Sequence, residues 1–238
     1  GKAPQPVVVY FHGGGFVIAT NDTYDASPRA LANQTGAIVV AVEYRKGPEN
    51  KFPAAHDDAY QSYLWVLKNA ASFGGDPNRV AVAGESAGGN LALNVAIMAR
   101  DQNKQLPVHE LLIYPVAGSD LNTESYKENA NAKPLNKPMM AWFLKNYMRT
   151  DGDKTDQRLN LVKADLHGLK PATVITAEVD PLRSEGKELA LQLETQGVKT
   201  QYKNFEGVTH EFFGMASVLD EAKKAQNLAS QSLKTAFQ

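Results

Sequence analysis

The feature that most constrains the fold is an alternation of short apolar runs with longer helical segments along the whole 238-residue chain. Continuous β-branched runs are typical of strands that are buried on both faces, whereas alternating polar and aromatic residues indicate an edge strand. The predicted strands comprise residues 6–11, 37–42, 79–83, 111–114 and 173–177, with an edge strand at 200–205. This pattern predicts one α/β domain over residues 1–238, with a mostly parallel sheet and helices on both faces.

The turn between the third strand and the next helix contains residues 84–88, Gly-Glu-Ser-Ala-Gly. A serine between two glycines at a strand-to-helix turn matches the GxSxG nucleophile elbow, in which a strained turn exposes the serine hydroxyl at the sheet edge. The alternative is an ordinary glycine-rich turn. Ser86 is therefore a candidate nucleophile, because parallel sheets bind ligands at the carboxyl ends of their strands.

A second glycine-rich segment, His-Gly-Gly-Gly at residues 12–15, directly follows the first strand. Three consecutive glycines allow backbone N–H groups to turn toward a ligand oxygen. The alternative is a flexible loop. His12 and Ser86 are both expected at the carboxyl edge of the sheet.

A serine nucleophile needs a base and an acid that orients the base. Among five histidines, His210 alone follows a late strand by a short loop, and Asp180 follows the fifth strand by two residues. The order Ser86, Asp180, His210 is that of α/β-hydrolases. Alone, Asp180 before a proline is also a good helix N-cap, and a lone late histidine is often a surface residue. Glu178 is the reserve candidate for the acid.

Composition narrows the possible functions. The formal net charge is −1 at pH 7, so no overall charge favours nucleic acid or an anionic membrane. The absence of cysteine excludes disulfides, thiolate catalysis and cysteine-ligated zinc, and no apolar run is long enough to span a bilayer. A soluble protein is expected. The compartment stays open between the bacterial cytoplasm and a periplasmic or secreted location reached after removal of a leader.

Taken together, these motifs resemble the bacterial hormone-sensitive-lipase-type (family IV) esterases of the α/β-hydrolase superfamily. The similarity extends over essentially the whole chain. It is carried by the segments at residues 12–15, 44–55, 84–90, 114–115, 180–182 and 207–210.

The resemblance implies an α/β-hydrolase fold and a serine carboxylesterase that hydrolyses short-acyl esters through an acyl-enzyme. Ser86 is implied as the nucleophile, His210 as the general acid–base and Asp180 as its orienting partner. The expected partner is a small-molecule ester, with no metal and no organic cofactor.

Carried over by motif, the oxyanion hole consists of the backbone N–H groups of Gly14, Gly15 and Ala87. His12 is expected to brace the glycine loop without transferring protons. Such donors stabilise the charge that develops on the tetrahedral intermediate.

Residues 116–150 are predicted to be a lid or pocket wall, because a long polar stretch is followed by a helix rich in aromatic residues. The expected substrate-binding residues are Phe16, Trp142, Phe143 and Phe212. Their apolar bulk favours acyl groups.

The chain departs from the family at its beginning. Members usually carry cap helices and two further strands before the first motif, whereas residues 1–5 alone precede it here. The strand at 38–42 would then be an exposed apolar edge, so a fragment, a processed chain or a homodimer that covers the edge is expected. Glu211 also differs from the commoner family residue, and beside His210 it would raise the pKa of the imidazole if it faced the site.

Two other function classes stay open at this stage. A peptidase or amidase uses the same triad. A non-catalytic small-molecule binder with this fold would keep the pocket without the chemistry.

Overall fold

A computed structural model describes residues 4–238 of the chain. Its centre is a six-stranded sheet in the order β2-β1-β3-β4-β5-β6, and all neighbouring strands are parallel. The strands are β1 (Gln5–Phe11), β2 (Ile38–Val42), β3 (Gly75–Glu85), β4 (Glu110–Ile113), β5 (Ala172–Val179) and β6 (Thr200–Thr209). Because the strands are parallel, their carboxyl ends all meet at one edge of the sheet.

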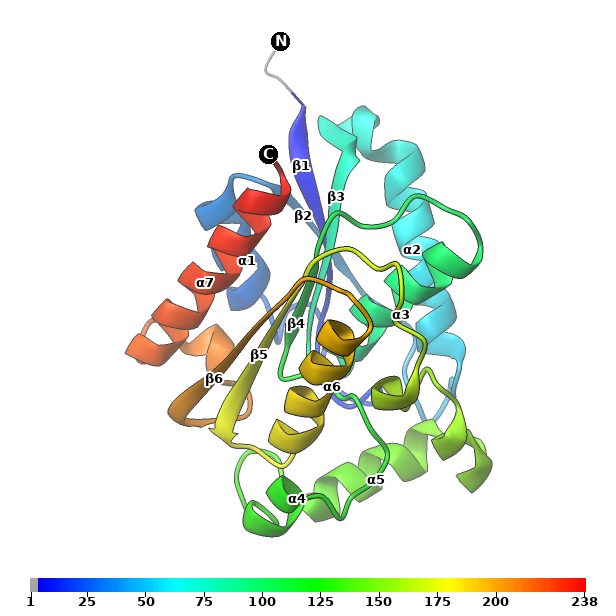
Figure 1. Cartoon of the computed structure of the whole chain (residues 1–238), viewed down its shortest axis with the longest axis vertical. Helices are drawn as coiled ribbons and strands as arrows, with labels where there is room; N and C mark the ends of the chain where they lie inside the picture. The colour runs from blue at the N-terminus through cyan, green and yellow to red at the C-terminus, as the bar shows by residue number, and fades with distance from the viewer. Residues whose placement is uncertain (1–3) are drawn as a thin grey trace.

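Helices cover both faces of the sheet (Figure 1). On one side lie α1 (Ala26–Thr35) and α7 (Asp220–Ala236), and on the other lie α2 (Ala54–Asn69), α3 (Ala87–Asp101) and α6 (Arg183–Thr195). The helices α4 (Glu124–Glu128) and α5 (Lys137–Tyr147) lie across the carboxyl end of the sheet. Short 3-10 helices complete the chain at Ala70–Phe73, Asp151–Thr155, Leu161–Lys163 and Phe212–Met215.

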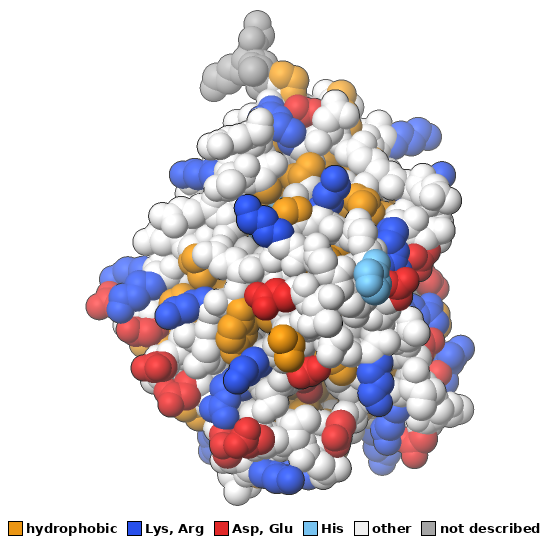
Figure 2. Space-filling model, in the orientation of Figure 1, with side chains coloured by type: hydrophobic (Ala, Val, Ile, Leu, Met, Phe, Trp, Pro, Cys, Tyr) orange, Lys and Arg blue, Asp and Glu red, His pale blue; other side chains and the backbone are white. Residues whose placement is uncertain are grey.

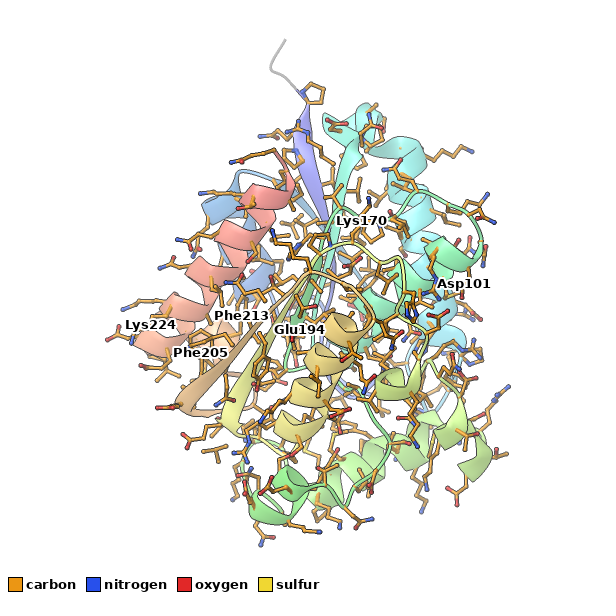
Figure 3. The ribbon with its side chains drawn as sticks, viewed as in Figure 1. Asp101, Lys170, Glu194, Phe205, Phe213 and Lys224 are labelled. Carbon is orange, nitrogen blue, oxygen red and sulfur yellow. The ribbon has the colours of Figure 1, made fainter. Side chains whose placement is uncertain are left out.

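The sheet separates two apolar clusters, one under each helical layer. Figure 3 shows Phe205 and Phe213 between the sheet and α7, where both are buried, while Lys224 projects from the outer face of α7. Burial of side chains on both faces explains the continuous apolar character of β1, whose residues from Val7 to Phe11 are fully buried. The sheet is therefore packed on both faces.

The sequence-based prediction of a mostly parallel sheet with helices on both faces is confirmed. The strand predicted at residues 79–83 begins earlier, because β3 also includes residues 75–78. There the pairing with β1 shifts register, and Asp76 Oδ1 accepts a hydrogen bond from the N–H of Asn78. The polar stretch after β4 also contains the short helix α4.

The strands β2 and β6 form the two edges of the sheet. Four of the five β2 residues are half-buried, as expected for an apolar edge. On the face seen in Figure 2, acidic and basic side chains are interspersed. Within residues 4–238, no helix combines the length and the apolar character that crossing a membrane requires.

Candidate active site

Ser86 lies at the sharp turn between β3 and α3. Its backbone has φ 57° and ψ −119°, a strained conformation for a residue with a side chain. The flanking glycines are required by close approach. A Cβ on Gly84 would lie 2.1 Å from the carbonyl oxygen of Gly88, and a Cβ on Gly88 would lie 2.0 Å from that of Phe11. The turn has the geometry of a nucleophile elbow.

The structure brings Ser86, His210 and Asp180 together from three strand ends. His210 Nε2 lies 3.0 Å from Ser86 Oγ, and His210 Nδ1 lies 2.7 Å from Asp180 Oδ2. The other carboxylate oxygen of Asp180 accepts a hydrogen bond from the N–H of Leu182 at 2.9 Å. With Nδ1–H donating to the carboxylate, Nε2 is free to accept the serine proton.

The three side chains are almost completely removed from solvent. Burial alone pulls the pKa of His210 down, but the charge of Asp180 and the hydrogen bond to it outweigh this effect, and Glu211 and Glu85 add to them. The pKa of His210 therefore lies above its ordinary value. The imidazole is thus a stronger base than a free histidine.

A buried carboxyl group missed by the sequence analysis lies beside the nucleophile. Glu85 accepts hydrogen bonds from the hydroxyl groups of Tyr10, at 2.5 Å, and Tyr114. Burial, followed by the charge of Glu211, raises the pKa of Glu85 to about 7. The sequence could have indicated this group. Tyr10 and Tyr114 lie at the carboxyl ends of β1 and β4, the two strands that flank β3, so their hydroxyl groups can reach Glu85.

The glycine loop is held from below by two stacked rings. His12 stacks on Tyr44 with centroids 4.4 Å apart, and its Nδ1 lies 2.7 Å from the carbonyl oxygen of Gly13. The Tyr44 hydroxyl donates to the carbonyl oxygens of His12 and Gly13, at 2.8 and 3.0 Å. Fixing these carbonyl groups fixes the peptide planes that follow in the loop.

The three backbone groups assigned to an oxyanion hole lie at the same edge. Gly14 and Gly15 line the cavity that also contains Ser86, and both have positive φ. Ala87 is the first residue of α3, so its N–H has no acceptor within the helix. Within residues 4–238, none of the three N–H groups donates to another backbone carbonyl. The positive end of the helix dipole also favours a developing negative charge there.

The cavity over Ser86 has a volume of about 440 Å³. Its walls come from the glycine loop, the start of α1, the segment before and within α5, and the loop after β6. Its apolar lining residues include Ile18, Pro134, Leu135, Met139, Phe143 and Met215. A mainly apolar cleft with a few convergent polar groups is typical of a small-molecule site.

Of the four aromatic residues expected in the pocket, Phe143 alone lines the cavity, where its ring packs against Gly15. Phe16 is buried and stacks on Tyr147, and Phe212 is buried against Tyr114 and Phe205. Trp142 is 48% exposed. Consecutive residues on a helix point about 100° apart, so Trp142 faces outward where Phe143 faces inward.

The remaining candidates occupy other places. Glu178, the reserve acid, accepts a hydrogen bond from the N–H of Gly207 at 2.7 Å. Glu211 lines the cavity, and its Oε1 lies 3.6 Å from His210 Nε2. In the described part of the chain, no group of three or more histidine and acidic side chains is arranged to hold a metal ion.

Another buried histidine, His56, lies behind the pocket wall. His56 Nδ1 lies 2.9 Å from the Tyr147 hydroxyl, and His56 Nε2 lies 2.9 Å from Asn90 Oδ1. Burial lowers the pKa of His56 to about 4. This neutral imidazole ties α5 to α2 and α3.

The parallel sheet, the strained turn at Ser86 and the buried imidazole of His210 beside it are typical of the α/β-hydrolase fold. Residues 8–214 match the family described as "alpha/beta hydrolase fold". The chain belongs to this family, among its hormone-sensitive-lipase-type members.

Similar proteins with known names are ester hydrolases. The chain is 41% identical over 236 residues to carboxylesterase NlhH of Mycobacterium tuberculosis, a match that covers 98% of this chain and 74% of that protein. It is 33% identical over 228 residues to an ethyl acetate hydrolase of Pseudomonas putida, covering 95% and 72% of the two chains. Among solved structures, an esterase of Pyrobaculum calidifontis aligns with a TM-score of 0.94 at 43% identity, covering 98% and 77%.

Proposed function

We propose that this protein is a serine carboxylesterase that hydrolyses short-acyl esters through an acyl-enzyme. The observation that carries this proposal is the continuous hydrogen-bond chain from Ser86 Oγ through His210 to Asp180, with distances of 3.0 and 2.7 Å. Its relatives include proteins named carboxylesterase and ethyl acetate hydrolase, which supports ester bonds as the target.

In the acylation step, Ser86 Oγ attacks the ester carbonyl carbon while its proton passes to His210 Nε2. Asp180 holds the imidazole in the tautomer that accepts this proton and stabilises the imidazolium that forms. The tetrahedral intermediate then collapses. The carbon–oxygen bond to the alcohol breaks, and the alcohol oxygen takes the proton from His210 Nε2.

In deacylation, His210 Nε2 removes a proton from water as the water oxygen attacks the carbonyl carbon of the acyl-enzyme. The bond between this carbon and Ser86 Oγ then breaks, the acid leaves, and Ser86 Oγ takes the proton back from His210 Nε2. In both steps the negative charge on the carbonyl oxygen is stabilised by the N–H groups of Gly14, Gly15 and Ala87. Each such donor contributes about 10²–10³ in kcat in enzymes where one has been removed.

The cavity supports a small acyl group. Its volume of about 440 Å³ is at the low end for a ligand site, and Leu135, Met139 and Phe143 close it on the α5 side. We assign residues 116–150 as the segment that supplies this wall. We therefore expect short acyl chains to fit within these walls, whereas longer chains must extend toward the open mouth.

Hydrolysis of p-nitrophenyl acetate, butyrate and laurate by the intact protein and by Ser86→Ala tests the proposed function. We expect turnover of the two short esters, a kcat/KM for laurate that is lower by about tenfold or more, and loss of turnover in Ser86→Ala. Unchanged turnover in the variant would rule out Ser86 as the nucleophile.

We also propose that the outer edge of β2, which pairs with no strand among residues 4–238, pairs with a second copy of the chain. Val40 and Val42 line a hollow beside this edge together with Trp65, which is 55% exposed. Unpaired apolar edge strands favour strand addition. Light scattering at micromolar concentration is expected to give the mass of a dimer, and a monomer mass would contradict this assignment.

A further inference from the structure

One acidic side chain at the mouth of the cavity has no role in the proposed mechanism. Glu211 follows His210 directly, and its backbone is in the left-handed region with φ 72°. This conformation turns the side chain back toward the cavity, where Oε1 accepts a hydrogen bond from the Tyr24 hydroxyl at 2.6 Å. The carboxylate is thus held in place while 36% of the side chain stays exposed.

The position of this carboxylate relative to the imidazole decides which part of an ester it meets. Oε1 of Glu211 lies 3.6 Å from His210 Nε2, the atom that contacts Ser86 Oγ. In an acyl transfer, this nitrogen delivers its proton to the oxygen of the leaving alcohol. Whatever lies beside Nε2 therefore lies beside the alcohol part of the substrate, whereas Phe143 packs against the oxyanion loop.

The charged side chains that line the cavity are acidic. Among the described residues that line it, Glu85 and Glu211 are acidic and none is lysine or arginine. Glu85 is buried and bonded to tyrosine hydroxyl groups, so Glu211 is the acidic group that a substrate can approach. A partly buried cavity wall weakens the screening of such a charge by water.

We propose that Glu211 makes this site select esters whose alcohol part carries a positive charge, such as esters of amino alcohols or quaternary ammonium alcohols. The inference rests on the proposed esterase function and adds the class of alcohol. A cationic group two or three bonds from the ester oxygen reaches the neighbourhood of the carboxylate. An anionic group there is repelled.

Acetylcholine and 3,3-dimethylbutyl acetate provide a matched pair, because they share the acetyl group and nearly the same shape but differ in charge. We expect kcat/KM to be higher for acetylcholine by about tenfold at low salt. Glu211→Gln should reduce this ratio by about fivefold to tenfold. The ratio is the readout because it cancels any effect through His210 that both esters share. Added salt should also reduce it.

The Glu206→Gln variant is the matched control. Glu206 lies on β6, is exposed and does not line the cavity, so its replacement changes the net charge by the same amount without changing the ratio. A second measurement uses p-nitrophenyl acetate as the substrate. Choline should inhibit its hydrolysis more strongly than 3,3-dimethylbutan-1-ol does, and Glu211→Gln should remove the difference.

The experiments distinguish failure of the selectivity assigned to Glu211 from failure of the proposed esterase function. If p-nitrophenyl acetate is hydrolysed but the two alcohols inhibit equally, or the ratio is the same in Glu211→Gln, the selectivity assigned to Glu211 is overturned and the esterase function stands. If the folded protein hydrolyses none of these esters, the proposed function itself fails.

Discussion

Two histidines of this protein, His210 and His56, are both buried, yet their pKa values are shifted in opposite directions. His210 and His56 both have a hydrogen-bond partner at each ring nitrogen. The pKa of His210 is raised, whereas burial lowers that of His56 to about 4. His210 faces the carboxylate of Asp180, and His56 faces the neutral groups of Asn90 and Tyr147. The comparison teaches that a buried imidazole is a base only where a buried carboxylate supports its charged form.

The largest effect is expected when Asp180 is replaced by asparagine, which leaves His210 with neutral partners, as His56 has. We expect kcat/KM for p-nitrophenyl butyrate to fall by about 10³–10⁴-fold, because the imidazole loses both its tautomer and the stabilisation of its charge. Steady-state kinetics on the folded variant checks this. A loss of less than about tenfold would mean that Glu178 or another group acts as the acid.

The variant His56→Gln is expected to lose stability and to keep its turnover. Loss of one of its two buried hydrogen bonds and of its packing against Phe16 and Phe52 should lower the free energy of unfolding by about 2 kcal/mol. Urea unfolding measures this. Turnover per folded molecule should change by less than about threefold, and a loss comparable to that of Asp180→Asn would remove the distinction between the two histidines.

Acid should destabilise the native protein partly through His56. Its pKa is about 4 in the folded chain and about 6.5 when unfolded, so between these values the unfolded state binds a proton that the folded state does not. The free energy of unfolding therefore falls as pH drops through this window, by up to about 3 kcal/mol. His56→Gln should show a shallower decline, and an equal slope in both proteins would contradict the assigned burial.

The smallest effect is expected on the pH profile of activity. The proposed mechanism requires neutral His210, so kcat/KM should fall as pH drops through the pKa of His210, which lies above 6.5. Glu211 contributes to this raised pKa. Glu211→Gln should therefore move the acidic limb to lower pH by roughly half a unit, whereas a shift to higher pH would show that the carboxylate does not face the imidazole.

The sequence predicted the strands and the main helices well, because each of them carried a local signal. The proposed nucleophile, acid and base each follow a strand, and parallel strands bring such positions to one edge whatever their separation in the chain. The glycines of the elbow and of residues 12–15 added signals that depend on backbone geometry alone.

What the sequence did not predict depends on side-chain direction. Phe143 and Trp142 are neighbours on α5, and the packing of the helix decides which one faces the cavity. Phe16 and Phe212 have the same apolar character as Phe143 but are buried in the core. Glu211 points toward His210 because of its left-handed backbone, which no pattern of residue types announces.

The most direct test of the central claim is the rate at which a fluorophosphonate probe labels the protein, with the modified residue located by mass spectrometry. The intact protein and His56→Gln should be labelled at Ser86 at similar rates per folded molecule, and Asp180→Asn should be labelled far more slowly. Labelling at another residue, or equally fast labelling of Asp180→Asn, would contradict a proton relay through Ser86, His210 and Asp180.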